Sequence, residues 1–588
     1  MKEEKIKGGK TMKARKILAA ILVSGMLVST MAACGGKATS DNGIASSETA
    51  NSGTAAAEVT NSGAPADPFG KYNETVTIHL ARSLDPNAKF ESGQSIEEND
   101  LLKEIKNQLN IEVKYDWICA PADFDQKIKL AISANNLPDA VAVGMTPFKA
   151  MAKYGQIADL TDTFNNYGSD ILKSFYKSGG DVLKKLVETD GKIMAIPATT
   201  PKASGMTEMW IRQDWLNKLN LQAPKSVEEL KNVAKAFMEQ DPDGDGKKNT
   251  IGIVGPSKSG GLTSTDGNLW GLDPVFAANK SFPGYWLKDK DGKVVYGSTQ
   301  PETKKALQAL AEMYKDGLID REMLVRDDSL QPVLDNKAGI FFGPWWTGYV
   351  LNDAYKQNPA PDWQAYAYPI ADDGKYYAHM SAPAGAFVVV NKKYEHPEAA
   401  LKIVNLLLPN ESKWVETGLG KNPGVPAVYP LWCVFDNVDE IEVSYDVLTK
   451  YLKGETDIKD IDFTTHKLLK GDMEAIKKLK KEPLDDFSIN NWDLKSELAS
   501  SHLARLISIM VGNKPLSTAN NIEEVYSLYY GQTTTMESKG ANLQKLENEA
   551  FAKIIMGRAS IDSFDDFVIK WNKQGGENIL KEIAEIAK

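Results

Sequence analysis

Carboxylate side chains near the middle of the chain recur at a spacing that suits a cation-binding loop. Residues 241–250 read Asp-Pro-Asp-Gly-Asp-Gly-Lys-Lys-Asn-Thr. Acids at positions 1, 3 and 5, glycine at 6, a backbone carbonyl at 7 and an amide oxygen at 9 match the start of an EF-hand-type loop, which surrounds Ca²⁺ with oxygen ligands. Position 12 is Gly252, so the bidentate glutamate of a complete EF-hand is missing. We expect a structural calcium site, and the alternative is a solvated turn without metal. The expected ligands are Asp241, Asp243, Asp245, Lys247 and Asn249.

Large aromatic residues gather in a second segment, residues 341–349, which reads Phe-Phe-Gly-Pro-Trp-Trp-Thr-Gly-Tyr. Consecutive large rings cannot all face one core, and Pro344 and Gly348 predict a loop after a strand. Sugar rings present C–H faces that pack on electron-rich aromatic rings, whereas their hydroxyls need polar partners. The pattern predicts that Trp345 or Trp346 contacts a sugar, and the alternative is that both rings are core residues.

Polar side chains at the ends of expected strands are further candidates. Arg212 ends one strand and could reach sugar hydroxyls, while Asp214 is better suited to capping a helix over residues 215–220. Asp139 precedes a strand that ends at Val143, where it either accepts hydrogen bonds from sugar hydroxyls or caps a turn. Ligands of open α/β sheets lie beyond the carboxyl ends of the strands, so the loop after Val143 is also a candidate.

Catalytic motifs give little support to an enzyme. The sequence has no G-x-S-x-G, H-E-x-x-H, Walker or G-x-G-x-x-G pattern. Its five histidines are scattered, and no two have the spacing of metal ligands. A glycosidase needs only two carboxylates that flank a bond, and the 79 acidic residues leave this alternative open.

The amino-terminal segment has the layout of a secretory signal. Residues 1–16 carry seven basic and two acidic residues, and an uncharged run from Ile17 to Ala33 follows. The small residues before Cys34 resemble the lipobox of bacterial lipoproteins, in which the cysteine becomes the lipid-bearing first residue. An ordinary signal peptide with a chance cysteine is the alternative, and Met12 is a second candidate for the start of the chain.

Composition and charge limit the class of protein. A chain of 588 residues with 42% hydrophobic residues can hold two or three domains of about 100–200 residues each. Removal of residues 1–33 lowers the net charge from −10 to −15, which disfavours nucleic acid as a partner. Residues 34–71 are rich in Gly, Ser, Ala and Thr and predict a flexible linker. Of the remaining cysteines, Cys119 and Cys433 are expected to be buried free thiols, with a disulfide between them as the alternative.

Strand and helix patterns alternate in the globular part of the chain. Period-two and apolar runs predict strands over residues 74–81, 111–117 and 137–143. Helical spacing of apolar residues predicts helices over residues 96–109 and 123–135. This order of elements predicts an open α/β sheet with crossover helices.

Several motifs taken together resemble one protein family. Residues 124–139 (FDQKIKLAISANNLPD) and 190–197 (DGKIMAIP) resemble first-lobe segments of family 1 of the extracellular solute-binding proteins of ABC importers. Residues 210–230, which include WIRQDWLNKLN and PKSVEEL, resemble the oligosaccharide-binding lipoprotein branch of that family, and so do residues 551–576. The resemblance runs from about residue 72 to the end of the chain.

The resemblance implies an α/β, two-lobed periplasmic-binding-protein-like clamp of type II, with a ligand cleft between the lobes and a helical C-terminal region. It implies crossovers between the lobes near Pro197–Met206 and Ser381–Phe387, which are rich in Pro, Gly and Ala. The implied division is a signal peptide at 1–33, a lipid-anchored linker at 34–71, an N-terminal lobe at 72–200 and about 382–430, and a C-terminal lobe with a helical extension at 201–381 and about 431–588.

The resemblance also implies a function. A monomer anchored by lipid to the outer face of the bacterial cytoplasmic membrane would capture an oligosaccharide or sugar and deliver it to the transmembrane subunits of an ABC permease. The family places a stacking aromatic at the position of Trp345 and, less closely matched, another at Trp270. Its shortened calcium loops often have an acid at position 10, where this chain has Thr250. The alternatives are a membrane-tethered sugar sensor or adhesin without transport and a secreted glycoside-active enzyme.

Overall fold

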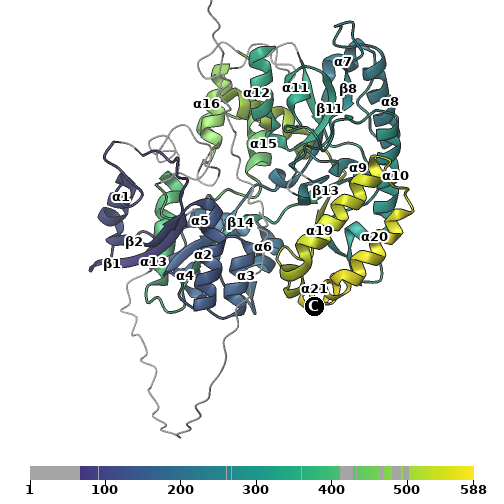
Figure 1. Cartoon of the computed structure of the whole chain (residues 1–588). Helices are drawn as coiled ribbons and strands as arrows, with labels where there is room; N and C mark the ends of the chain where they lie inside the picture. The colour runs from purple at the N-terminus through teal and green to yellow at the C-terminus, as the bar shows by residue number, and fades with distance from the viewer. Residues whose placement is uncertain are drawn as a thin grey trace, which may run out of the picture.

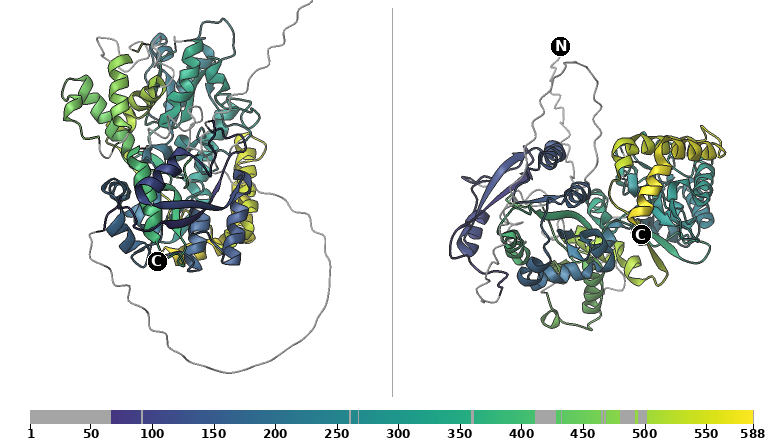
Figure 2. Two further views of the ribbon diagram at one scale, coloured as in Figure 1. Left: turned by 90° about the vertical axis from the view of Figure 1, so that its left-hand side faces the viewer. Right: turned by 90° about the horizontal axis from the view of Figure 1, so that it is seen from below.

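The computed structural model describes most of the globular part of the chain. The described residues are 66–90, 92–259, 261–266, 268–358, 361–410, 428–431, 433–463, 466, 468–479, 492–493 and 502–587. The expected signal segment and Cys34 lie outside them. The described chain forms two lobes side by side, with the first strands in one lobe and the last helices on the other (Figures 1 and 2). Within the described ranges, every helix is too short or too polar to span a membrane.

The first lobe is built on a five-stranded sheet in the order β2-β1-β3-β14-β6. β1 pairs in parallel with β2 and β3, whereas β14 runs antiparallel to β3 and β6. Residues that alternate along β14 enter different cores, because Val388 and Val390 join one buried cluster and Phe387 and Val389 join another. The strands are β1 (Val76–Ser83), β2 (Ile111–Cys119), β3 (Ala140–Val143), β6 (Ile196–Thr199) and β14 (Ala384–Val390), and a small pair adds β4 (Glu188–Thr189) and β5 (Lys192–Ile193).

Helices cover both faces of this sheet (Figure 1). The expected order of strand, helix, strand, helix and strand is present as β1-α1-β2-α2-β3. The first helix begins at Asp100 rather than at residue 96, because the side chain of Asn99 accepts a hydrogen bond from the Leu102 amide and caps the helix there. The helices are α1 (Asp100–Leu109), α2 (Pro121–Ala134), α3 (Met145–Lys153), α4 (Thr161–Tyr167), α5 (Asp170–Ser178), α6 (Gly180–Val187) and α13 (Pro397–Leu407).

The second lobe is built on a four-stranded sheet in the order β12-β7-β11-β8. β7 runs antiparallel to β11 and β12, while β8 is parallel to β11. Neighbouring large side chains alternate between the two faces, so Phe341 joins one core cluster and Phe342 the other. The strands are β7 (Glu208–Arg212), β8 (Ile251–Ile253), β11 (Ala338–Gly343) and β12 (Trp363–Tyr366), and two small pairs add β9 (Trp286–Lys288) with β10 (Val294–Tyr296) and β13 (Tyr376–Met380) with β15 (Ile522–Tyr526).

The last part of the chain covers the second lobe. α19–α21 contribute to the core cluster on one face of the sheet, and α15–α17 contribute to the cluster on the other face. The helices of this lobe are α7 (Gln213–Lys218), α8 (Val227–Glu239), α9 (Asp273–Ala278), α10 (Pro301–Lys315), α11 (Gln331–Leu334), α12 (Gly348–Gln357), α15 (Glu440–Leu452), α16 (Leu469–Leu479), α17 (His502–Ile507), α18 (Lys514–Thr518), α19 (Thr534–Ile555), α20 (Ser563–Trp571) and α21 (Glu577–Ile586). Short turns include the 3₁₀ turns η1 (Lys202–Gly205) and η4 (Trp345–Thr347) and the π-helical turn η8 (Ser508–Gly512).

The chain passes between the lobes three times within the described residues. β6 keeps its place in the first sheet up to Thr199, so the first crossing occupies residues 200–207. The second crossing is only residues 381–383, because β14 already pairs with the first sheet from Ala384. The third crossing, residues 436–439, joins Phe435 in a core of the first lobe to α15.

Neither Cys119 nor Cys433 forms a disulfide. Cys119 is half-buried at the end of β2, and Cys433 is buried. The alternative of a disulfide between them is therefore not realised.

Candidate functional site

Two tryptophan-bearing loops meet at one edge of the second sheet. β8 and β11 are neighbours and run in parallel, so their carboxyl ends lie at the same edge. The loop after β8 carries Trp270, and η4 after β11 carries Trp345 and Trp346. The rings of Trp270 and Trp346 meet edge to face, with centroids 5.2 Å apart and an angle of 89°. The fold therefore joins residues that lie 76 positions apart into one aromatic cluster at the carboxyl edge of parallel strands.

The close approach of these loops depends on a glycine. A Cβ atom at Gly343 would lie 3.0 Å from Cδ1 and 3.1 Å from Nε1 of Trp270. The Trp270 ring therefore lies directly over the end of β11. Its Nε1 is buried and has no hydrogen-bond partner among the described residues. Trp270 and Trp346 are both half-buried and pack against the core cluster that contains Trp345.

Trp345 occupies a different environment from its neighbour. It is only 5% exposed and belongs to the core cluster that includes Trp210 and Phe341. Its Nε1 donates a hydrogen bond of 3.4 Å to Ser204 Oγ in the first crossing between the lobes. Its backbone lies directly on η8, because a Cβ atom at Gly512 would come within 2.1 Å of the Trp345 carbonyl oxygen. The structure therefore places Trp345 in the core, against the stacking role that the resemblance implies for it, while Trp346 is half-buried against the same core.

Arg212 lies at the opposite edge of this sheet, which corrects the expectation that it would reach a sugar. β7 is antiparallel to β11 with Glu208 opposite Gly343, so Arg212 is four residues, roughly 13 Å, from the aromatic edge. Its guanidinium donates to both carboxylate oxygens of Asp214, at 2.7 and 2.5 Å, and lies 4.2 Å from the centre of the Trp215 ring. The side chain is 4% exposed and is part of the packing of the lobe.

Asp139 also lies at the wrong end of its strand for ligand contact. It precedes β3, whereas the carboxyl end of β3 at Val143 is the end beside the second crossing. One carboxylate oxygen of Asp139 accepts a 2.8 Å hydrogen bond from the backbone N–H of His79. Of the two roles considered for Asp139, the structure therefore favours the structural one, in which it ties β1 to β3.

The acidic loop gathers its carboxylates as the spacing predicts. Oxygen atoms of Asp241, Asp243 and Asp245 lie within 4.8 Å of one another. The backbone N–H of Gly246 donates to Asp241 at 3.1 Å, and that of Lys247 donates to Asp245 at 2.7 Å. These bonds fold the backbone around the three acids. The loop precedes β8, so it lies at the edge of the sheet opposite the tryptophans.

The electrostatics of the acidic loop suit a cation. Burial, together with a hydrogen bond to Asp241, raises the pKa of Asp243, and the same hydrogen bond lowers the pKa of Asp241. Hydrogen bonds from the Asn249 amide and the Lys247 backbone lower the pKa of Asp245. Among the described residues, Asp241 Oδ1 and Asn249 Oδ1 are buried without a hydrogen-bond partner. The donor set is all oxygen, which fits the hard cation Ca²⁺.

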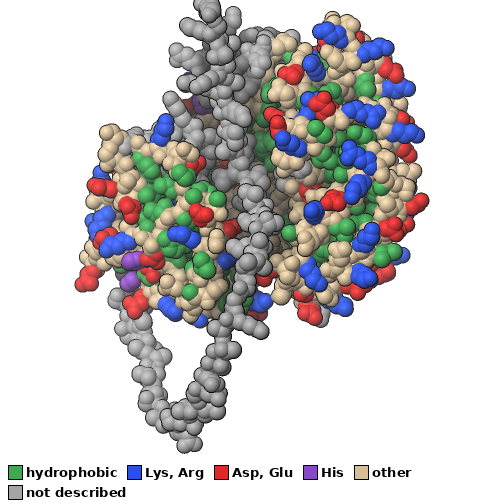
Figure 3. Space-filling view, viewed as in Figure 1, with side chains coloured by type: hydrophobic (Ala, Val, Ile, Leu, Met, Phe, Trp, Pro, Cys, Tyr) green, Lys and Arg blue, Asp and Glu red, His purple; other side chains and the backbone are tan. Residues whose placement is uncertain are grey.

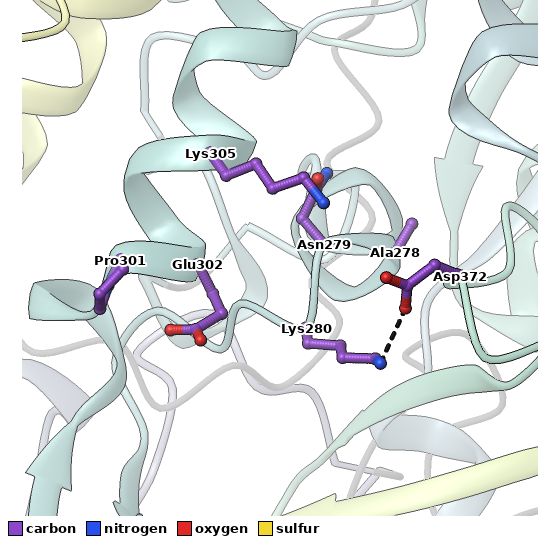
Figure 4. A pocket seen from close by; sticks show the side chains of 7 residues that line it. All are labelled: Ala278, Asn279, Lys280, Pro301, Glu302, Lys305 and Asp372. Atoms are coloured by element: carbon purple, nitrogen blue, oxygen red, sulfur yellow. Dashed lines mark ion pairs between the residues drawn. The ribbon is translucent and has the colours of Figure 1, made fainter.

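A pocket of about 290 Å³ opens elsewhere on the second lobe, between the end of α9 and the start of α10 (Figure 4). Lys280 in its wall lies 2.7 Å from Asp372 and 3.0 Å from Asp373, so its charge is compensated within the protein. The pocket lies at the far end of α9 from Trp270. Figure 3 shows acidic and basic side chains interspersed over the visible face of both lobes.

One polar contact beside the aromatic loops was not predicted from the sequence. Asp273 is 2% exposed and follows Trp270, and its carboxylate lies 3.1 Å from Nδ1 of His379. Ser264 donates to the same carboxylate through Oγ at 2.6 Å and through its backbone N–H. His379 belongs to β13, so the contact ties the loop after β8 to the strand before the second crossing. Asp273 and His379 are 106 positions apart, and no local spacing signals such a pair.

Comparison with known proteins decides the family. The family model for bacterial extracellular solute-binding proteins matches residues 93–414, more than half of the chain. The chain is a bacterial extracellular solute-binding protein. The expected family and the two-lobed type of fold are thereby confirmed.

Similar solute-binding proteins are known from other bacteria. The polygalacturonan/rhamnogalacturonan-binding protein YtcQ of Bacillus subtilis is 24% identical over 497 residues, which cover 83% of this chain and 88% of YtcQ. The lipoprotein LipO of the same species is 23% identical over 523 residues, covering 87% of this chain and 92% of LipO. Among solved structures, a solute-binding protein of Bifidobacterium longum infantis described as binding HMO has a TM-score of 0.56 at 16% identity, covering 87% of this chain and 98% of that one. The complex of Streptococcus pneumoniae FusA with kestose has a TM-score of 0.51 at 17% identity, covering 87% and 98%. These structures share the fold.

Proposed function

We propose that this solute-binding protein captures an oligosaccharide at the aromatic edge of its second lobe and delivers it to an ABC permease. The observation that carries the proposal is the pair of half-buried tryptophans, Trp270 and Trp346, at the carboxyl edge of parallel strands beside the crossings. Rings in this position offer flat apolar surface to the C–H faces of sugars. Trp345 supports the platform from within through its bond to Ser204.

Known relatives support this class of ligand. YtcQ is named for polygalacturonan and rhamnogalacturonan, and S. pneumoniae FusA, 25% identical over 270 residues that cover 44% of this chain and 47% of FusA, is named for fructooligosaccharides. These ligands differ in charge and linkage but share sugar rings. We therefore propose an oligosaccharide as the class and draw no preference for one sugar from these names.

Binding without turnover is the proposed activity. The family consists of solute-binding proteins. The three clustered acids, Asp241, Asp243 and Asp245, lie at the edge of the sheet opposite the aromatic cluster. A sugar sensor or adhesin without transport would use the same site, so only the permease partner separates it from an importer component.

The acidic loop is proposed to bind structural calcium. Asp241, Asp243 and Asp245 would hold the ion with the Lys247 carbonyl and the Asn249 amide oxygen. The ion would neutralise carboxylates that otherwise repel one another and would brace the connection between α8 and β8. Solved relatives include a calcium-free form of the alginate-binding protein AlgQ2 and an EF-hand mutant of FusA.

Anchoring by lipid at Cys34 is the proposed means of localisation. The sequence around Cys34 supports it, and the relative LipO is named a lipoprotein. A diacylglyceryl group would hold the protein at the outer face of the cytoplasmic membrane, where a monomer would meet the permease.

A thermal-shift screen of the purified protein against neutral and acidic oligosaccharides tests the proposed function. A ligand at one hundred times its dissociation constant should stabilise the protein by about 2.7 kcal/mol. Hits should also change tryptophan fluorescence, because the proposed site contains indole rings. Release of shorter sugars from a labelled oligosaccharide would instead indicate an enzyme, and no shift with any saccharide would refute sugar binding.

A further inference from the structure

The three crossings between the lobes are bonded to one another. The backbone N–H of Thr200 in the first crossing donates to Pro383 in the second at 3.0 Å. The N–H of Lys202 donates to Val438 in the third at 2.8 Å. The first crossing is therefore the central member of the hinge. Any rotation of one lobe against the other must be accommodated around it.

The side chain of Lys202 extends from this central crossing to two carboxylates on other elements. Its Nζ lies 2.9 Å from Oε1 of Glu524 and 3.9 Å from Oε1 of Glu442. Glu524 lies on β15, which pairs with β13 just before the second crossing. Glu442 lies in the first turn of α15, just after the third crossing. One ammonium group thus contacts acids that belong to the approaches of the other two crossings.

The surroundings of Glu442 are predominantly acidic. Its side chain is 19% exposed, and Lys202 is the cation that faces it. His466 faces Asp439, with its Nε2 3.5 Å from Asp439 Oδ1. The charged and titratable groups that face Glu442 from the described residues are Lys202 of η1, Asp439 of the third crossing, and Glu524 and Tyr526 of β15.

Burial raises the pKa of Glu442 to about 7, despite the attraction of Lys202, and the charges of Asp439 and Glu524 add to the rise. The hydrogen bond to Glu524 and the charge of Glu442 keep the pKa of Lys202 above its ordinary value although burial alone would lower it. Lys202 therefore stays charged while Glu442 gains or loses its proton near neutral pH.

We propose that Lys202, Glu442 and Glu524 form a proton-sensitive latch between the first crossing and the second lobe, which shifts the balance between open and closed arrangements of the lobes. With Glu442 protonated, Lys202 is held by Glu524 alone and α15 stays packed against the first crossing. When Glu442 ionises, its charge favours arrangements of the hinge in which water reaches it. The inference extends the proposed function, because the ligand is captured by closure of the same lobes.

The latch is tested on ligand-free protein, so that it does not depend on finding the ligand. Nitroxide labels at the exposed positions Lys129→Cys on α2 and Lys235→Cys on α8 report the distance between the lobes by double electron–electron resonance. Cys34→Ser and Cys119→Ser keep these two cysteines from taking a label, and Cys433 is buried. Distances are recorded from pH 5.5 to 8.5.

The proposal predicts a change in the distance distribution with a midpoint near pH 7. Glu442→Gln should keep the low-pH distribution throughout, and Lys202→Met should move the midpoint to higher pH because Glu442 loses its cation. Asp446→Asn is the matched control, since Asp446 lies on α15 but pairs with exposed Lys450 rather than with the hinge, and it should behave like the unsubstituted protein.

Two outcomes would overturn the latch: an unsubstituted protein whose distances do not change with pH, or a Glu442→Gln variant that keeps the same transition. If the pKa of Glu442 differs by one unit between the open and the closed arrangement, the ratio of the two populations should change up to about tenfold across the transition. Ligand affinity, once a saccharide is identified, should follow the same midpoint. If the distances change with pH as expected but no saccharide binds, the hinge inference stands and only the proposed function is refuted.

Discussion

Replacement of Trp346 by alanine should weaken oligosaccharide binding and leave the fold intact. The ring is half-buried at the aromatic edge and meets Trp270 edge to face at 5.2 Å. Loss of one stacking surface costs about 1–3 kcal/mol where it has been measured for bases on aromatic side chains. At about 1.4 kcal/mol for each factor of ten, the dissociation constant should rise roughly 5- to 140-fold.

Replacement of Trp345 should act on stability instead. This neighbouring ring is 5% exposed and packs in the core of the second lobe. Truncation of a buried tryptophan to alanine lowers the free energy of unfolding by about 3–5 kcal/mol, because transfer and cavity terms add. The turn that carries Trp346 also loses its bond to Ser204. The two adjacent residues should therefore give opposite patterns of affinity and stability.

Isothermal titration with a saccharide from the screen and denaturant unfolding measure the two quantities separately. Tyr154→Ala is the matched control, because Tyr154 is an exposed aromatic residue at the end of α3 in the other lobe and should change neither. If Trp346→Ala binds as tightly as the unsubstituted protein, the aromatic platform is refuted. The ligand site would then have to be sought around the loop after Val143 in the first lobe.

Three further predictions follow from single sites. EDTA should lower the melting temperature of the unsubstituted protein but not of an Asp243→Ala/Asp245→Ala double variant, and equal responses would show that the loop is only a turn. Burial and the charge of a nearby acid raise the pKa of Glu547 from an ordinary 4.5 to about 8, so the folded state holds this proton more tightly than the unfolded chain. The free energy of unfolding should therefore fall by up to about 1.4 kcal/mol per pH unit between roughly pH 5 and 8, and Glu547→Gln should lose that slope in denaturant titrations. Cys34→Ser should appear in the medium or remain unprocessed in cell fractions, and lipid-free Cys34 in the unsubstituted protein would contradict the anchor.

The order of the first elements and the acidic loop could be predicted from the sequence because their signals are local. Alternation along a strand and helical spacing act over a few residues, which is why β1-α1-β2-α2-β3 is found in the expected order. The gathering of Asp241, Asp243 and Asp245 likewise depends on one short loop. For Trp345 and Trp346 the sequence predicted only that one of the rings contacts a ligand, with both rings in the core as the alternative.

Only the tertiary structure decided which of these two residues is the more exposed and which candidates share an edge. Arg212 follows a strand as the tryptophans do, but β7 runs antiparallel to β11 and therefore carries Arg212 to the opposite edge. Strand direction follows from the pairing of segments that are far apart in the chain. The same holds for the latch, because Lys202 and Glu524 are 322 positions apart and meet only when the three crossings are assembled. Local patterns specify elements, whereas the order and direction of strands in the sheets specify which side chains meet.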